Sequence, residues 1–171
     1  MASGSKSLAA RPTRANDKFG LHPQSIITED DHLQTLKTLC GVPPEVEFSL
    51  PTPEESPESG RPRWFCIFSV YLTGCGWFFP IPEILLLYLR SLGLAFPQMT
   101  PNMLRIILSV LVVATEAKYA MSVGDLFELF SVRLSKRSGL GLYACYPHFD
   151  RALVTGFADK DEHWRHFWFF V

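Results

Sequence analysis

A strongly apolar segment in the second half of the chain predicts a buried central helix. At residues 101–119 nearly every side chain is hydrophobic, and the polar residues Arg105, Ser109 and Glu116 form only a thin stripe. Thr100 precedes this segment and is a favourable N-cap residue. Because a helix that is apolar on nearly all sides belongs in a core, we expect residues 101–119 to form the central helix of the fold.

Three further segments have the sequence signals of helices. The stretch at 28–41 has Thr28 as its predicted N-cap, acidic residues in its first turn and a glycine at its end. The stretch at 82–93 opens on a proline, carries many leucines and closes on a glycine. The fourth predicted helix begins at Ser122 with a capping box and runs into the basic sequence at 131–139, where cations suit the negative end of the helix dipole.

The remaining hydrophobic segments are typical of strands. The residues at 64–72 are largely β-branched and aromatic. In the tail, the segments at 142–147, 151–157 and 163–171 also indicate strands. The sequence therefore predicts an α+β fold with four helices and a small, mainly antiparallel sheet, which the strand at 64–72 forms with the C-terminal strands.

Composition divides the chain into three parts. Residues 1–24 are small, polar and basic without any periodicity, so we expect a disordered tail. Residues 25–60 contain the short first helix and a linker rich in Pro, Glu and Ser, which we interpret as a solvated loop, with a docking segment as the alternative. Residues 61–171 hold most of the apolar sequence and are expected to form the folded domain.

The overall composition points to an intracellular protein. A net charge of −1 gives no global field that favours nucleic acid or acidic membranes. The four cysteines are widely spaced among apolar residues, as reduced and buried thiols are. The apolar runs are shorter than the roughly 20 residues that a membrane span needs, and the first twenty residues contain no signal sequence. We therefore expect no membrane association, and the choice between nucleus and cytoplasm stays open.

Two pairs of potential metal ligands occur in the tail. Cys145 and His148 form one pair, and His163 and His166 form the other, with a spacing that resembles a zinc module. In an extended segment, however, residues three apart point to opposite faces of the strand. Ordinary histidines are therefore favoured over a metal site, and no cofactor is expected.

No other constellation indicates catalysis. The sequence contains neither the G-x-S-x-G elbow nor a phosphate-binding glycine loop with its lysine, and the paired carboxylates lie in polar surroundings. We expect no catalytic residues. The basic residues Arg133, Lys136 and Arg137 are candidate phosphate contacts, although three cations at a predicted helix end are also explained by the helix dipole.

From about Phe65 to the end, a series of motifs resembles the gypsy-type transposon domain of plant proteins, also described as a plant transposon protein domain or a Gag-like N-terminal domain of retrotransposons. The order and spacing of the motifs carry the resemblance, because no single one is diagnostic. They are Phe79-Pro80-Ile81-Pro82, Leu92-Gly93-Leu94-Ala95, Gln98-Met99-Thr100-Pro101-Asn102, Leu126-Phe127-Glu128-Leu129-Phe130, Gly141-Leu142-Tyr143 and Trp164-Arg165-His166-Phe167-Trp168-Phe169-Phe170-Val171. Two positions depart from the family pattern: its Gly-Trp-Tyr strand is Leu142-Tyr143-Ala144 here, and its closing Lys-Asp is Arg165-His166.

The resemblance implies an origin in retroelement reading frames, without implying transposase activity. The protease, polymerase and zinc-knuckle signatures of such elements are missing from the sequence. We therefore expect a non-enzymatic domain with a structural or interaction role in a Gag-like polyprotein, through self-association or contacts with other polyprotein segments. A nucleic-acid-binding module is the alternative, and a fragment of a metal-dependent nuclease or integrase is a third hypothesis.

The end of the sequence, His163 to Val171, is its most aromatic stretch. In the resembling family the sequence continues beyond this stretch. We therefore expect that the chain is truncated at its C-terminus relative to a longer reading frame. On this view the last strand leaves part of its apolar face uncovered, and the chain self-associates.

Overall fold

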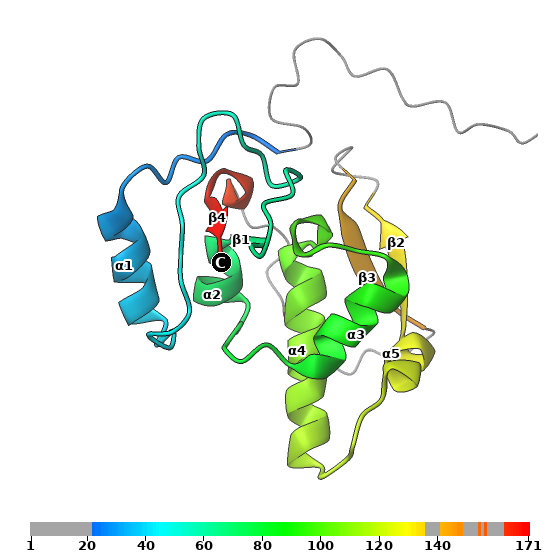
Figure 1. Ribbon diagram of the computed structural model, residues 1–171. Helices are drawn as coiled ribbons and strands as arrows, with labels where there is room; N and C mark the ends of the chain where they lie inside the picture. The colour runs from blue at the N-terminus through cyan, green and yellow to red at the C-terminus, as the bar shows by residue number, and fades with distance from the viewer. Residues whose placement is uncertain (1–21, 136–140, 149–153, 155, 157–162) are drawn as a thin grey trace, which may run out of the picture.

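The computed structural model describes residues 22–135, 141–148, 154, 156 and 163–171, and it confirms the α+β class (Figure 1). Among these residues it contains five α-helices, two short 3-10 helices and two separate antiparallel pairs of strands, where the sequence predicted four helices and one sheet. The elements are α1 (Asp30–Leu39), β1 (Cys66–Phe68), α2 (Ser69–Gly74), α3 (Glu83–Leu92), η1 (Phe96–Gln98), α4 (Pro101–Glu116), α5 (Val123–Leu129), β2 (Phe130–Leu134), β3 (Tyr143–Pro147), η2 (Trp164–His166) and β4 (Trp168–Phe170).

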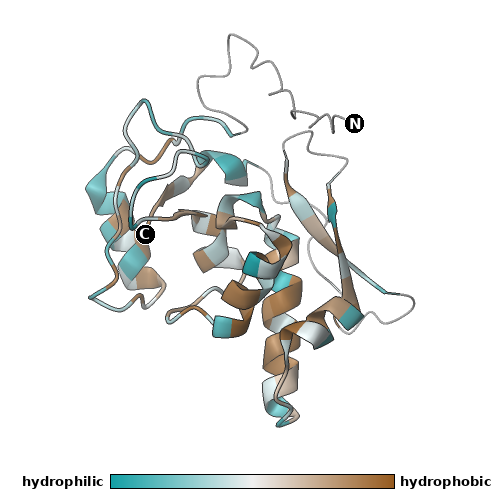
Figure 2. Ribbon diagram, turned by 45° about the vertical axis from the view of Figure 1, so that its right-hand side comes forward, coloured by the Kyte–Doolittle hydropathy of each residue, from teal (hydrophilic) through white to brown (hydrophobic). Residues whose placement is uncertain are grey.

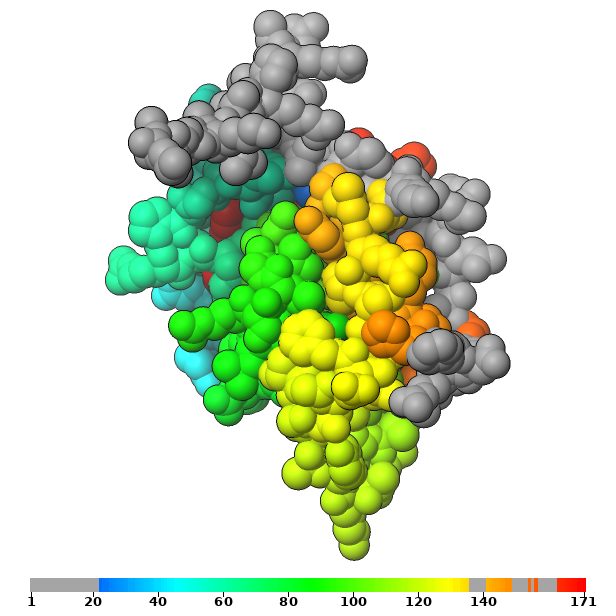
Figure 3. All heavy atoms as spheres, turned by 90° about the vertical axis from the view of Figure 1, so that its right-hand side faces the viewer, coloured from blue at the N-terminus to red at the C-terminus, as the bar shows by residue number. Residues whose placement is uncertain are grey.

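The predicted central helix is α4, which lies between the two strand pairs in Figure 1. Its N-cap is Thr100, whose hydroxyl accepts a hydrogen bond from the backbone N–H of Met103 at 3.2 Å. The expectation of burial on all sides was wrong, because Val112 and Val113 are 53% and 47% exposed. Neighbouring elements cover one face of α4, while its end and the following loop form the protruding tip at the bottom of Figure 3.

The predicted strand at 64–72 is a strand only as far as Phe68, after which the chain turns into α2. The change to a helix brings the side chain of Tyr71 into the core. Its hydroxyl donates to the backbone carbonyls of Phe96 and Met99 at 3.0 and 2.8 Å. Hydrophobicity alone did not reveal this turn, because β-propensity largely reflects burial rather than a backbone preference.

Strand β4 is the most enclosed part of the fold. It pairs antiparallel with β1, so that Cys66 faces Phe170 and Phe68 faces Trp168. On its other side, Ser49 forms a bridge to Phe170, and the N–H of Ile26 donates to the carbonyl of His166 at 2.9 Å. The three residues of β4 are at most 1% exposed, which contradicts the expectation of an uncovered apolar face.

The two segments that precede β1 therefore belong to the folded domain. Ser25 is buried and its hydroxyl donates to the carbonyl of Trp168, while the indole N–H of Trp168 donates to the carbonyl of Pro23. The expected tail at 1–24 is thus ordered from His22 onward, and the rest of it lies outside the described residues. The linker is likewise docked on β4 through Ser49 rather than solvated along its length.

The second strand pair replaces the end of the fourth predicted helix. Helix α5 has the predicted capping box, in which the N–H of Asp125 donates to the hydroxyl of Ser122 at 3.2 Å. It ends at Leu129, and β2 follows at once and pairs with β3. The prediction that the helix continues through 131–139 was therefore wrong for residues 131–134, which form β2. Positions 136–139 lie outside the described residues.

The other predicted element boundaries need smaller corrections. Helix α1 has Glu29 rather than Thr28 as its N-cap. Helix α3 ends as predicted at Gly93, whose left-handed backbone (φ 65°) suits glycine. Of the three predicted tail strands, the first corresponds to β3 and the last is a turn of 3-10 helix (η2) followed by β4. Most of the segment at 151–157 lies outside the described residues.

The hydroxyls of Tyr71 and Tyr88 provide a test of this core. Both side chains are fully buried. The Tyr71 hydroxyl donates to backbone carbonyls, whereas the Tyr88 hydroxyl has no hydrogen-bond partner among the described residues. We expect Tyr71→Phe to lower the free energy of unfolding by about 1–3 kcal/mol, since it strands buried acceptors. Tyr88→Phe is expected to change it by less than about 0.5 kcal/mol or to raise it. Urea unfolding of both variants measures the difference, and equal losses would contradict this hydrogen-bond pattern.

Candidate functional site

Two hollows in the surface are candidate binding sites. The first, which we call the linker cleft, has a volume of about 570 Å³ and lies between linker residues 57–60, residues 64–66, helix α3 and residues 94–98. The second, which we call the α4 groove, has a volume of about 440 Å³. It is lined by Phe78, Pro82, Ile84, Leu108, Leu111, Val112, Ala114, Thr115, Glu116, Tyr119 and Met121.

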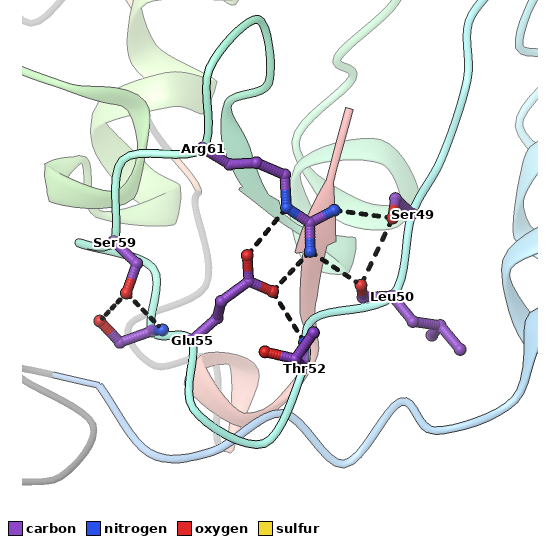
Figure 4. Close-up of polar contacts among 7 residues, drawn as sticks. Ser49, Leu50, Thr52, Glu55, Ser59 and Arg61 are labelled. Carbon is purple, nitrogen blue, oxygen red and sulfur yellow. Dashed lines mark hydrogen bonds and ion pairs between the residues drawn. The ribbon is translucent and has the colours of Figure 1, made fainter.

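Arg61 holds the linker in place through several polar contacts (Figure 4). Its guanidinium forms a fork on the carboxylate of Glu55, and it also donates to the hydroxyl of Ser49 at 2.7 Å and to the carbonyl of Leu50 at 3.2 Å. The same group lies 4.0 Å from the ring centroid of Phe170 in β4. Arg61 thus connects Ser49, Leu50 and Glu55 of the linker to the last strand, so these polar groups stabilise the fold.

His22 and Glu58, which both line the linker cleft, form a second polar contact. The Nδ1 atom of His22 lies 2.5 Å from a carboxylate oxygen of Glu58, and the histidine ring packs 5.1 Å from the ring of Phe68. Burial pushes the pKa of Glu58 up, but the hydrogen bonds to its carboxylate, foremost the one to His22, outweigh this and leave the pKa below its ordinary value. Glu58 is therefore an anion at neutral pH and ties the N-terminal segment to the linker.

Cys66 lines the same cleft, but its chemistry does not suit a nucleophile. Burial raises the pKa of its thiol well above the ordinary value, and the negative charge of Glu58 adds to this. A protonated thiol is a poor nucleophile and a poor metal ligand. The linker cleft can accommodate an apolar or aromatic group between Trp64, Phe65 and Phe96.

The α4 groove is lined mainly by apolar side chains, and several of them are exposed. Several large side chains on or beside it are half exposed, namely Phe78 (53%), Val112 (53%), Val113 (47%) and Tyr119 (55%). Figure 2 shows hydrophobic colouring along much of α4 towards its protruding end. Contiguous exposed apolar surface of this kind marks interaction sites in soluble proteins. The groove can therefore accept an apolar partner surface.

The sequence did not reveal this groove. The hydrophobic run at 101–119 predicted a helix that in fact ends at Glu116, and hydrophobicity does not tell which face of a helix the rest of the fold leaves uncovered. A partial signal was present in the thin polar stripe, a line along α4 on which Arg105 and Ser109 are half-buried and Glu116 is exposed. Val112 falls on that line, seven residues after Arg105 and four before Glu116.

The structure separates the two predicted pairs of metal ligands. Cys145 is buried in β3, where burial raises the pKa of its thiol to about 12. His148 follows β3, and its backbone N–H donates to Leu129. Within the described residues, no three His, Cys, Asp or Glu side chains are grouped so that they could hold a metal ion.

The geometric argument against His163 and His166 was wrong in its premise. These residues lie on the turn that forms η2, not on an extended strand, and their rings come within 6.1 Å of each other. The two histidine rings are therefore close to each other, but within the described residues they do not form a metal-binding group with Cys145 or His148.

The candidate phosphate contacts are only partly described. Arg133 lies on the exposed end of β2 rather than at a helix terminus, with its guanidinium 5.8 Å from the ring centroid of Tyr146 on β3. Lys136 and Arg137 lie outside the described residues. The explanation of this cluster by a helix dipole therefore does not apply to Arg133.

The chain is similar to a distant relative among curated proteins. No protein-family model matches the chain, and no solved structure matches it. The chain is 28% identical over 149 residues, or 87% of its length, to an uncharacterized chloroplastic protein of Arabidopsis thaliana, At3g60930. It spans 18% of the length of that protein. Among the described residues, no helix combines the length and the apolar character that crossing a bilayer requires.

The acid sensitivity of the Arg61 contact tests the docking of the linker. The hydrogen bond from Arg61 holds the pKa of Glu55 below its ordinary value. The ionised carboxylate of Glu55 therefore stabilises the folded state at neutral pH. This stabilisation is lost as pH falls from about 4.3 through the lower pKa of the folded state. At pH 7 we expect Glu55→Gln to lower the free energy of unfolding by about 1 kcal/mol, and the difference from the original chain should vanish in acid.

Glu54→Gln is the matched control, because Glu54 is the exposed neighbour of Glu55. It is expected to change stability by less than about 0.5 kcal/mol at any pH. Unfolding in urea at a series of pH values measures both variants. Equal and pH-independent effects of the two substitutions would show that Arg61 does not hold the linker through Glu55.

Proposed function

We propose that the chain is a non-enzymatic interaction domain of a plant protein derived from a gypsy-type retrotransposon, with a structural role in a Gag-like polyprotein. The origin rests on the motif series described above, from Phe79-Pro80-Ile81-Pro82 to the closing aromatic stretch. The interaction role rests on one observation, the exposed apolar α4 groove. The natural occupant of such a groove is an apolar face of another polypeptide.

The chemistry of the groove supports binding rather than catalysis. Most of its lining is aliphatic or aromatic, and its charged member, Glu116, lies at the exposed end of α4. Association would remove Phe78, Val112 and Tyr119 from water, at roughly 25 cal/mol for each Å² of apolar surface buried. This driving force is non-directional, so the polar groups at the edge of the groove decide which partner fits.

We place the protein inside the cell. The four cysteines are free, and three of them are buried, as is usual for a protein in a reducing compartment. The name of the Arabidopsis relative assigns that protein to the chloroplast, so chloroplasts join the nucleus and cytoplasm as compartments to examine. Imaging of a tagged full-length protein distinguishes the three.

Substitutions in the α4 groove test the proposed function. Val112→Asp and Phe78→Asp are each expected to weaken binding to other segments of the parent polyprotein at least ten-fold, because the new carboxylate must lose its water on association. Both side chains are about half exposed, so the fold should tolerate the changes. Isothermal titration of the chain with each separately produced segment measures the affinity.

The matched control is Leu39→Asp, since Leu39 is 79% exposed at the end of α1, outside the groove. It is expected to leave the affinity unchanged. If all three variants bind alike, or if neither another segment nor a second copy of the chain binds the unaltered chain, the α4 groove is not an interaction site within the polyprotein.

A nucleic-acid-binding module is the second candidate function. The observation that favours it is the pair formed by Arg133 and Tyr146 on adjacent strands, since an arginine and an aromatic ring can contact a phosphate and a base together. We expect Arg133→Ala to reduce the slope of log affinity against log salt concentration by about one for single-stranded RNA or DNA. Fluorescence anisotropy at several salt concentrations measures the slope, with Arg63→Ala as the control for loss of an exposed cation. An unchanged slope would remove Arg133 from any phosphate contact.

A further inference from the structure

One line of residues along α4 has a symmetric pattern, with Arg105 and Ser109 half-buried and Val112 and Glu116 exposed. Arg105, Ser109, Val112 and Glu116 follow one another at intervals of four, three and four residues, so they share one face of the helix. Arg105 and Glu116 carry opposite charges at its two ends. The midpoint between these two residues falls between positions 110 and 111, and so does the midpoint between Ser109 and Val112.

This pattern is complementary to itself when two helices run in opposite directions. An antiparallel copy of α4, centred on the same midpoint, would place Glu116 opposite the partner's Arg105 at both ends of the contact. In the middle, Val112 would lie opposite the small Ser109 of the other copy, which lets the helices approach closely. The two charged ends are about 16 Å apart along the axis, three turns of helix.

The surroundings of the line suit this arrangement. The guanidinium of Arg105 is held in place by the carbonyl of Gly74 and the side chain of Asn102, each at 2.8 Å. Glu116 lies at the protruding end of α4, where the tip stands clear of the body in Figure 3. Val112 and Glu116 also line the α4 groove, so a helix on this line would cover one wall of the groove.

We propose that the partner of the α4 groove is a second copy of the same chain, packed through antiparallel α4 helices about a two-fold axis. This inference rests on the proposed function, because it names the partner of that site. A two-fold contact uses one surface twice, so each residue must meet its complement in the other copy. Any helix face has this spacing, but the opposite charges of Arg105 and Glu116 at its two ends make the line complementary to a second antiparallel copy of itself.

Charge reversal at one end of the line tests the proposal. Analytical ultracentrifugation of the full chain should show a monomer–dimer equilibrium. Glu116→Arg would place an arginine opposite the partner's Arg105 at both ends, so it should weaken dimerisation at least ten-fold, an effect that added salt reduces. Glu128→Arg makes the same charge change on an exposed face of α5 and should leave the dimer unchanged. Circular dichroism of each variant verifies that the fold is retained.

Cysteine cross-linking tests the register. A mixture of one copy carrying Ser109→Cys with another carrying Val112→Cys should form an intermolecular disulfide faster than either variant alone, because only the mixed pair lies directly opposite. The unaltered chain under the same oxidation controls for its natural cysteines. No preference for the mixed pair would overturn the antiparallel register.

Two results would overturn the proposal as a whole. One is a chain that stays monomeric at all concentrations tested, and the other is a dimer that Glu116→Arg and Glu128→Arg affect equally. If the chain is monomeric but other polyprotein segments still bind in a manner that depends on Val112, the proposed function stands and only the second-copy partner is wrong. If neither association depends on Val112, both are wrong.

Discussion

The burial of β4 is the constraint on which the rest of the fold depends. Three large aromatic residues, Trp168, Phe169 and Phe170, lose nearly all contact with water in a strand only three residues long. One strand pair cannot enclose such side chains, because a two-stranded sheet is only marginally stable by itself. The residues at 22–27 and the linker at 49–61 complete the enclosure through backbone and side-chain hydrogen bonds. Segments that look dispensable in the sequence thus become part of the core.

Local signals in the sequence located several of the helix ends correctly. The N-cap at Thr100, the capping box at Ser122 and the stop at Gly93 all appear where predicted, since each depends on residues within one turn of the helix end. Signals that depend on distant residues failed. The strand at 64–72 gives way to α2 after Phe68, where its pairing with the distant β4 ends, and the first part of the basic segment after α5 is β2, which pairs with β3.

The candidate sites also show the difference between local signals and signals that depend on distant residues. The sequence identified His163 and His166 as neighbours but assigned them to a strand, and the turn of η2 that brings their rings together was not visible in the composition. The α4 groove depends on where neighbouring elements stop covering a helix, and a hydrophobicity pattern does not contain that information. The likeness to gypsy-type transposon domains depends on the order of motifs in the sequence, and it stays a prediction, because the relative found by comparison is itself uncharacterized.

Helix α4 therefore combines two roles that place opposite demands on its sequence. Its buried face, with Leu104 and Ile107 fully enclosed, holds the strand pairs together and needs apolar side chains at every position. Its exposed face needs polar side chains for solubility, yet it retains Val112 and Val113 between Arg105 and Glu116. A valine pair on a solvated helix face contributes little to the stability of the isolated chain, since its surface stays in contact with water. Such residues are stabilising only when another surface covers them, and the charges at the two ends then restrict which surface that is.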